Sequence, residues 1–192
     1  MNLPNKLTLS RVVLTAVFLV LLFAHGLVYK LSAVLVFSVA ALTDFLDGFI
    51  ARNNNLVSDF GKFMDPIADK ILILAAFLAF VEMKLVPAWM VIIIIFREFM
   101  ITGLRIVALK KNRVIEATLA GKHKTVSQLM TVFIILVFIC LREVGFTWEF
   151  WTPDLESYYL GAILFLMSVT VLLTLVSGFS IAARHMRIFH EG

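Results

Sequence analysis

Long apolar runs separated by short polar segments make up most of this chain. Two of the runs contain no formally charged residue: Val12 to Tyr29, with 18 residues, and Ser157 to Ala183, with 27. The hydrocarbon core of a bilayer is about 30 Å thick, and a helix needs about 20 residues to cross it. Each of these two runs is therefore predicted to be a helix that can span a membrane unaided.

The remaining apolar runs are shorter and border on charged residues. They cover Leu31 to Thr43, Ile71 to Val81, Leu85 to Phe96 and Val126 to Leu141. The first three reach the length of a span only when they include charged pairs, which are Asp44 with Asp47, Asp65 with Asp69, and Arg97 with Glu98. A charge at bilayer depth is costly unless it faces a wet cavity or a partner, so these six residues are candidates for function. Buried helices of a soluble protein are the alternative interpretation of such short runs, and the two uncharged runs argue against it.

We predict an all-α, polytopic membrane protein with six transmembrane helices in a single domain that covers residues 1–192. The predicted spans are 10–28, 31–52, 61–82, 86–108, 121–142 and 158–182. Pro87 is expected to open the fourth span, and Thr147 to Ser157 is expected to be a loop. Residues 1–11 are interpreted as an interfacial segment of the mature protein rather than as part of a cleaved signal peptide.

Composition and charge agree with this class and orient the chain. The chain is 61% apolar and 16% charged, whereas soluble domains carry roughly 25% charge. Its one cysteine, Cys140, excludes a disulfide framework and a thiolate metal site. With the amino terminus in the cytoplasm, most basic residues lie on that side, and only Lys30, Lys84 and Arg142 lie opposite. The positive-inside rule therefore predicts a multi-pass protein of the cell membrane in this orientation. Contact with anionic lipid heads explains the basic pI near 9.4 without nucleic acid.

Four aspartates form the main candidate site. Asp44 and Asp47 are three residues apart and Asp65 and Asp69 are four apart, so each pair lies on one face of its helix. A loop of about eight residues, 53–60, makes the two helices antiparallel neighbours. Four carboxylates that converge must take up protons or cations, and hard divalent ions prefer such oxygen ligands. We expect two Mg²⁺ or Mn²⁺ ions; a structural acid cluster paired with nearby basic side chains is the alternative.

Small residues stand beside these aspartates. Gly48 and Ala51 follow Asp47 on the same stretch, where little side-chain bulk lets a large group approach the backbone or lets helices pack closely. Small residues in membrane helices more often serve packing. Because these two residues lie beside the carboxylates, we favour contact with a bound ligand over helix packing here.

The string D-x2-D-G-x2-A-R-x8-G-x3-D-x3-D resembles the signature of the CDP-alcohol phosphotransferases at all eight fixed positions. The resemblance implies a six-helix membrane enzyme, generally dimeric, that transfers a phosphatidyl or related group from a CDP-linked donor to an alcohol and releases CMP. It implies that Asp44, Asp47 and Asp65 are metal ligands, and that Asp69 is both a metal ligand and the general base. It also implies a nucleotide pocket formed by Asp44, Gly48, Ala51 and Arg52, with help from Gly61.

Basic residues on the fourth and fifth helices suggest the acceptor. Arg97 and Arg105 are eight residues apart, about 12 Å along a helix. Glu98 is expected to point elsewhere, so Arg97 should face a cavity that holds an anion or one of the aspartates. Arg105, Lys122 and Lys124 lie nearer the cytoplasm and can cradle a phosphate. Alternatively, Lys122 and Lys124 are only positive-inside anchors.

Three further strings, MNLPNKLTLSR, REF-x2-TGLR and GK-x-KT, resemble one branch of this family. In that branch the donor is CDP-diacylglycerol and the acceptor is glycerol 3-phosphate. The expected partners are therefore these two substrates, membrane lipids and a second copy of the chain, with no nucleic acid. Within the family, the alternatives are the branch that makes cardiolipin from phosphatidylglycerol and a branch that accepts a phosphoinositol. Outside it, the aspartates could serve a divalent-cation transporter, although no repeated or discontinuous helices are visible, and a structural scaffold would leave them unexplained.

Overall fold

The computed structural model describes the backbone of residues 3–51, 59–110 and 119–185 and the side chains of most of them. These residues form six helices and no strands. The helices are α1 (Leu3–Phe23), α2 (Leu27–Ala51), α3 (Asp59–Glu82), α4 (Ala88–Lys110), α5 (Leu119–Thr147) and α6 (Pro153–His185). The all-α prediction is confirmed for this part of the chain, and each helix overlaps one predicted span.

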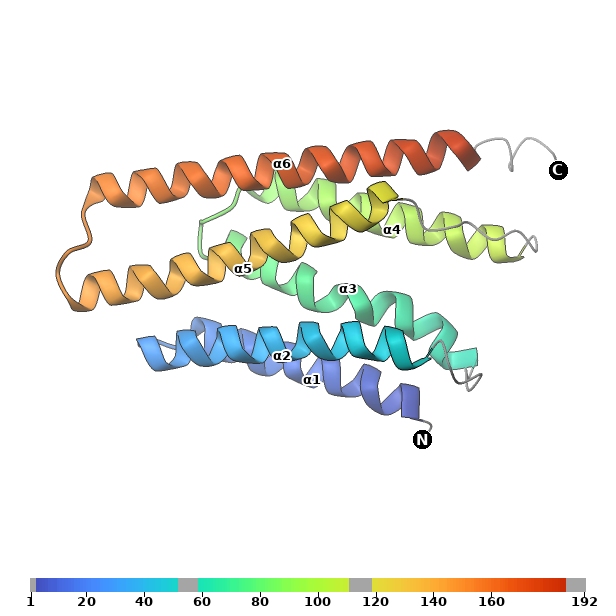
Figure 1. Ribbon diagram of the computed structural model, residues 1–192, viewed down its shortest axis with the longest axis horizontal. Helices are drawn as coiled ribbons and strands as arrows, with labels where there is room; N and C mark the ends of the chain where they lie inside the picture. The colour runs from blue at the N-terminus through green and yellow to red at the C-terminus, as the bar shows by residue number, and fades with distance from the viewer. Residues whose placement is uncertain (1–2, 52–58, 111–118, 186–192) are drawn as a thin grey trace.

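The six helices lie roughly along one direction and alternate in sense along the chain (Figure 1). The connections α1–α2, α3–α4 and α5–α6 gather at one end of the bundle, here named the turn end. The other end, where α1 begins, is named the amino end. Helix α1 contacts α2 and α3, while α4 contacts α3 and α6, and α5 contacts α2, α3 and α6. The last turns of α2, the first turns of α3, the end of α4 and the start of α5 therefore all lie toward the amino end.

Several helix boundaries differ from the predicted spans, and the start of α6 has a clear local reason. Helix α6 begins at Pro153 rather than at residue 158. Thr152 acts as its N-cap, because its Oγ1 accepts a hydrogen bond of 3.2 Å from the backbone N–H of Leu155, and proline is suited to the first helical position. Helix α5 continues to Thr147, so the predicted loop at 147–157 is shorter than expected. Helix α1 begins at Leu3 and runs unbroken through residues 3–11, whose location at a membrane interface stays a prediction.

Polar side chains join the connections at the turn end. Gly26 has φ +107°, a conformation that strains any residue with a side chain. Its backbone N–H donates to Glu143 Oε1 of α5 at 2.9 Å. Glu156 accepts a hydrogen bond from Trp151 Nε1 at 2.5 Å and forms an ion pair with Arg142 Nη2 at 2.9 Å. These contacts tie the α1–α2 turn to α5 and close the α5–α6 hairpin.

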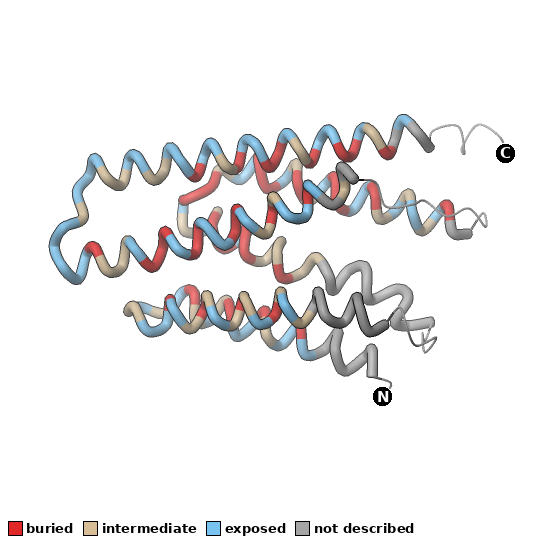
Figure 2. The backbone as a smooth tube through the Cα atoms, viewed as in Figure 1, coloured by how far each residue is buried: buried red, intermediate tan, exposed pale blue. Residues whose placement is uncertain are grey.

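The core consists of aromatic and branched side chains packed against alanines. Phe18 and Phe37 join α1 to α2, with ring centroids 5.4 Å apart. Ala33, Ala40 and Ala76 are fully buried or nearly so, and small residues of this kind allow helices to approach closely. Figure 2 shows buried positions on the inward sides of the helices and a run of exposed positions along α6.

Many exposed side chains of α6 are large and apolar, as expected for a surface in contact with lipid. They include Leu164, Phe165, Leu172, Val176 and Phe179. Among the described residues, two segments are long and apolar enough to cross a membrane, namely His123–Thr147 with 25 residues and Pro153–Ile181 with 29. Ser10–Phe23 and Leu27–Thr43 are shorter apolar segments. The prediction that the uncharged run Val12 to Tyr29 forms a single spanning helix is wrong, because the connection at residues 24–26 divides this run between α1 and α2.

Candidate functional site

The structure places seven of the eight signature residues on two helices. Asp44, Asp47, Gly48 and Ala51 lie in the last turns of α2, and Gly61, Asp65 and Asp69 lie in the first half of α3. Because α2 and α3 run in opposite directions, both segments lie toward the amino end of the bundle (Figure 1). Arg52 is outside the described residues, as are the side chains of these seven positions. Their convergence on metal ions stays a prediction.

The described side chains do not offer a competing metal site. Within the part of the chain whose side chains are described, no group of three or more His, Cys, Asp or Glu residues is placed to hold a metal ion. The four aspartates on α2 and α3 therefore remain the candidates, and a set of carboxylate oxygens suits a hard divalent ion.

The aspartate segment of α3 leads directly into a described polar cluster. Lys70 follows Asp69 in the sequence, and its Nζ donates to Thr102 Oγ1 of α4. The same ammonium is 3.4 Å from the backbone oxygen of Glu98 and 3.5 Å from Glu98 Oε2. Helix α3 is therefore attached to α4 one residue after the predicted general base.

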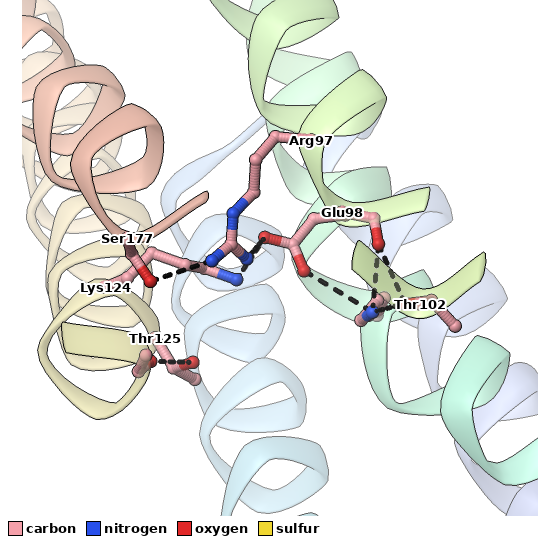
Figure 3. Close-up of polar contacts among 8 residues, drawn as sticks. Arg97, Glu98, Thr102, Lys124, Thr125 and Ser177 are labelled. Carbon is pink, nitrogen blue, oxygen red and sulfur yellow. Dashed lines mark hydrogen bonds and ion pairs between the residues drawn. The ribbon is translucent and has the colours of Figure 1, made fainter. Parts of the chain in front are cut away.

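Glu98 is the centre of this cluster. Its Oε1 pairs with Lys124 Nζ of α5 and with Arg97 Nη1 at 3.3 Å, while its Oε2 faces Lys70. Arg97 Nη2 in turn donates to Ser177 Oγ of α6 at 2.8 Å. We name Lys70, Arg97, Glu98 and Lys124 the Glu98 hub; Figure 3 shows its side chains from α4 and α5, with Ser177. The hub links α3, α4, α5 and α6.

The prediction that Glu98 points away from Arg97 is wrong. The two residues are adjacent, so their side chains leave the helix about 100° apart, yet both are buried, with exposed fractions of 6% for Arg97 and 3% for Glu98. The arginine side chain is long enough to reach the Glu98 carboxylate despite this difference in direction. Arg97 therefore meets Glu98 and Ser177 among the described residues, rather than the anion or aspartate expected from the sequence.

The sequence marked Glu98 as a charged residue at membrane depth, but sequence reasoning gave it no partner and no role in the site. The available signal was a carboxylate inside an apolar run, next to an arginine at the same depth. Buried cations in a membrane helix need a compensating carboxylate, and Glu98 was the nearest one in the sequence. The interpretation failed because it considered only the faces of one helix and not the side chains that arrive from others.

The predicted acceptor residues separate into two groups. Arg97 and Lys124 lie in the hub, and Lys124 is 5% exposed. Arg105 is exposed and lies two turns farther along α4, about 10 Å from Glu98 along the helix axis. The side chain of Lys122 is outside the described residues. Within the hub, one carboxylate faces three cations, so these four side chains together carry a surplus of positive charge. That they bind the acceptor phosphate stays a prediction.

A glycine on α6 makes room for the hub. A Cβ atom added at Gly178 would lie 3.0 Å from Arg97 Cγ and 3.2 Å from Arg97 Nε. Real Cβ contacts are rarely this short, so the close approach of α6 to Arg97 depends on glycine. The neighbouring Ser177 then reaches the guanidinium.

Further polar side chains form hydrogen bonds between α5 and α6. Thr170 hydroxyl oxygen lies 3.0 Å from Ser127 Oγ and 2.8 Å from Thr131 Oγ1. Gln128 is buried one turn from Lys124 on α5. Such contacts hold helices together in lipid through hydrogen bonds rather than through hydrophobic burial.

A family model and several known proteins are similar to most of this chain. The sequence model described as CDP-alcohol phosphatidyltransferase matches residues 1–176. The CDP-diacylglycerol–glycerol-3-phosphate 3-phosphatidyltransferase of Bacillus subtilis (strain 168) is 43% identical over 148 residues, which cover 71% of this chain and 77% of the relative. A probable phosphatidylglycerophosphate synthase of Mycobacterium tuberculosis (strain ATCC 25618 / H37Rv) is 33% identical over 189 residues, with 97% of this chain and 82% of the relative covered. A CDP-diacylglycerol–glycerol-3-phosphate 3-phosphatidyltransferase of Shigella flexneri serotype 5b is 32% identical over 189 residues, which cover 95% of each chain.

Proposed function

This chain belongs to the CDP-alcohol phosphatidyltransferase family, and on that premise we propose that it transfers a phosphatidyl group from CDP-diacylglycerol to glycerol 3-phosphate. The products are phosphatidylglycerophosphate and CMP. The names of the relatives that cover most of the chain support this donor and this acceptor. They also favour an enzyme over a divalent-cation transporter.

One structural observation carries the proposal. The helix that bears Asp65 and Asp69 continues at Lys70 into a hub with surplus positive charge. A transferase for this reaction needs an acidic half for metal ions and the donor diphosphate, and a cationic half for the acceptor phosphate. The contact of Lys70 with α4 supports the proposal that the acidic half and the cationic half are neighbours.

The reaction requires a nucleophile, a proton acceptor and a leaving group. A hydroxyl oxygen of glycerol 3-phosphate attacks the phosphorus that carries the diacylglycerol, and the bond from that phosphorus to the CMP oxygen breaks. CMP leaves with the electron pair, and Asp69 accepts the proton of the attacking hydroxyl. Two Mg²⁺ or Mn²⁺ ions held by Asp44, Asp47, Asp65 and Asp69 would neutralise the diphosphate and stabilise CMP as it leaves. Gly48, Ala51 and Gly61 leave space for the cytidine nucleotide beside Asp44, and Arg52 completes this pocket.

The acceptor phosphate is bound by the basic residues of α4 and α5. Arg105, Lys122 and Lys124 are assigned to the phosphate oxygens, and Arg97 supports them from the hub. Charge-assisted hydrogen bonds of this kind are roughly twice as strong as neutral ones. A branch that accepts an uncharged alcohol has less use for these cations.

The proposed setting is a cell membrane crossed by all six helices, with the amino end toward the cytoplasm and two copies of the chain in a dimer. The apolar exposed side chains of α6 and the two long apolar segments support insertion in lipid. The orientation is supported by the excess of basic residues on the side of the amino end. It agrees with the source of the acceptor, since phosphorylated glycerol is a soluble molecule of the cell interior.

The acceptor is tested with a panel. Purified protein in detergent is supplied with labelled CDP-diacylglycerol, Mg²⁺ or Mn²⁺, and one acceptor at a time: glycerol 3-phosphate, glycerol, serine, inositol phosphate or phosphatidylglycerol. We expect rapid CMP release and labelled phosphatidylglycerophosphate only with glycerol 3-phosphate. Turnover with another acceptor alone would move the chain to another branch of the family. If no acceptor in the panel supports CMP release, the proposed reaction is contradicted.

A further inference from the structure

The Glu98 carboxylate is buried and its oxygens are already engaged by cations. Oε1 contacts Lys124 and Arg97, and Oε2 contacts Lys70. A carboxylate whose oxygens are engaged by three cations is not free to bind a metal ion. Its contribution is therefore to determine where the cations lie.

Lys124 depends on this carboxylate for its position. Its side chain is nearly fully buried, and the ion pair with Glu98 compensates for its charge. A lysine side chain is a flexible stem with a compact charge at its end. Without a buried partner, such a charge extends toward water. Glu98 thus keeps the Lys124 ammonium inside the bundle, where the ion pair joins the start of α5 to α4.

The same carboxylate also connects the two halves of the proposed site. Lys70 belongs to the aspartate-bearing helix α3 and Lys124 to the basic start of α5, and both contact Glu98 on α4. Lys70 is additionally held by Thr102 Oγ1 one turn farther along α4. A change at Glu98 therefore alters the placement of the acceptor cations relative to the helix that carries Asp69.

We infer that Glu98 is a positioning residue that holds Lys124 where the phosphate of the acceptor binds. Glu98 itself does not touch the substrate. The inference rests on the proposed function, because it concerns the acceptor half of that same site. It assigns a role to a residue that lies outside the signature and outside the predicted set of acceptor ligands.

The first test separates positioning from folding. Glu98→Gln keeps the size of the side chain and removes its charge, Glu98→Asp keeps the charge on a shorter stem, and Glu82→Gln is a matched control at an exposed position at the end of α3. We expect Glu98→Gln to raise the KM for glycerol 3-phosphate by about tenfold or more, as for other residues that orient a ligand. The KM for CDP-diacylglycerol should stay within about twofold. The KM of Glu98→Asp for glycerol 3-phosphate should lie between the values for Glu98→Gln and for the unchanged protein.

The second test asks whether Glu98 acts through Lys124. Lys124→Met alone and combined with Glu98→Gln complete a double-mutant cycle. If Glu98 serves to hold Lys124, the double variant should have the same KM for glycerol 3-phosphate as Lys124→Met. Independent, multiplicative effects of the two substitutions would overturn the inference.

Other outcomes are equally decisive. Equal losses for both substrates, with a lower melting temperature and no selective rise in the KM for glycerol 3-phosphate, would show a purely structural role and refute positioning. Should Glu98→Gln not be obtained as folded protein, Glu98→Asp decides the question by the same selective rise in KM. The unchanged protein is assayed first: lack of turnover there refutes the proposed function, whereas turnover without the selective effect refutes only the role of Glu98.

Discussion

Gly178 offers a direct test of how closely α6 packs on the hub. Substitution of Gly178 by alanine adds a Cβ atom 3.0 Å from Arg97 Cγ and 3.2 Å from Arg97 Nε, whereas ordinary contacts begin at 3.4 Å. The arginine stem must therefore retreat by about 0.4 Å. It has little freedom to do so, because Nη2 is bonded to Ser177 at 2.8 Å and Nη1 faces Glu98 at 3.3 Å.

The expected loss of stability follows from a comparison with Gly161 on the same helix. Overpacking of a buried site costs about 1 to 3 kcal/mol, while replacing glycine by alanine within a helix gains about 0.5 to 1 kcal/mol. At Gly161 a Cβ atom meets nothing within 4 Å, so only the gain applies. The difference in stability between Gly178→Ala and Gly161→Ala isolates the overpacking cost. At about 2 to 4 °C per kcal/mol for a chain of this size, Gly178→Ala should melt about 2 to 12 °C below Gly161→Ala.

The measurement is thermal unfolding of both purified variants in the same detergent, followed by circular dichroism. The KM for glycerol 3-phosphate provides a second readout, since displacement of Arg97 disturbs the hub. We expect that KM to rise for Gly178→Ala and to stay unchanged for Gly161→Ala. A Gly178→Ala variant that melts at or above the temperature of Gly161→Ala would refute the close packing of Gly178 on Arg97.

Three further predictions concern catalysis, the acceptor and the turn end. Asp69→Asn should abolish CMP release without lowering the melting temperature, and normal turnover would contradict its role as general base. Arg105→Ala should raise the KM for glycerol 3-phosphate more than that for CDP-diacylglycerol; an equal rise would argue against contact with the acceptor phosphate. Gly145→Ala should lower the melting temperature relative to Gly161→Ala, because its Cβ would lie 2.4 Å from Trp151 Cε3, and equal melting temperatures would show that the indole moves aside without cost.

Local sequence patterns predict the helices and the main candidate residues. Each helix overlaps a predicted span because the apolar runs and the polar segments between them are local properties of the chain. The placement of the signature residues on two antiparallel helices followed from their spacing and from the short segment between them. The start of α6 was predicted late because a cap at Thr152 and a proline at the first position extend the helix beyond its apolar part.

The polar hub was not predictable in the same way. Arg97 and Glu98 are neighbours in sequence, and helix periodicity alone places their side chains on different faces. Apart from each other, their partners lie 26 to 80 residues away, at Lys124, Lys70 and Ser177. Which side chains meet a buried carboxylate depends on how four helices pack, including the close approach that Gly178 permits.

The sequence by itself determined the helical segments, their suitability for a membrane and the spacing of the aspartates. The helices and the membrane follow from composition and run length, whereas the CDP-linked donor is implied by the resemblance of the eight-residue string to the family signature. The tertiary structure alone decided that Glu98 gathers the cations of α3, α4 and α5, and that Arg97 is paired rather than exposed to a cavity. The physical reason is that a buried charge is stabilised by the groups packed around it, and those groups come from distant parts of the chain.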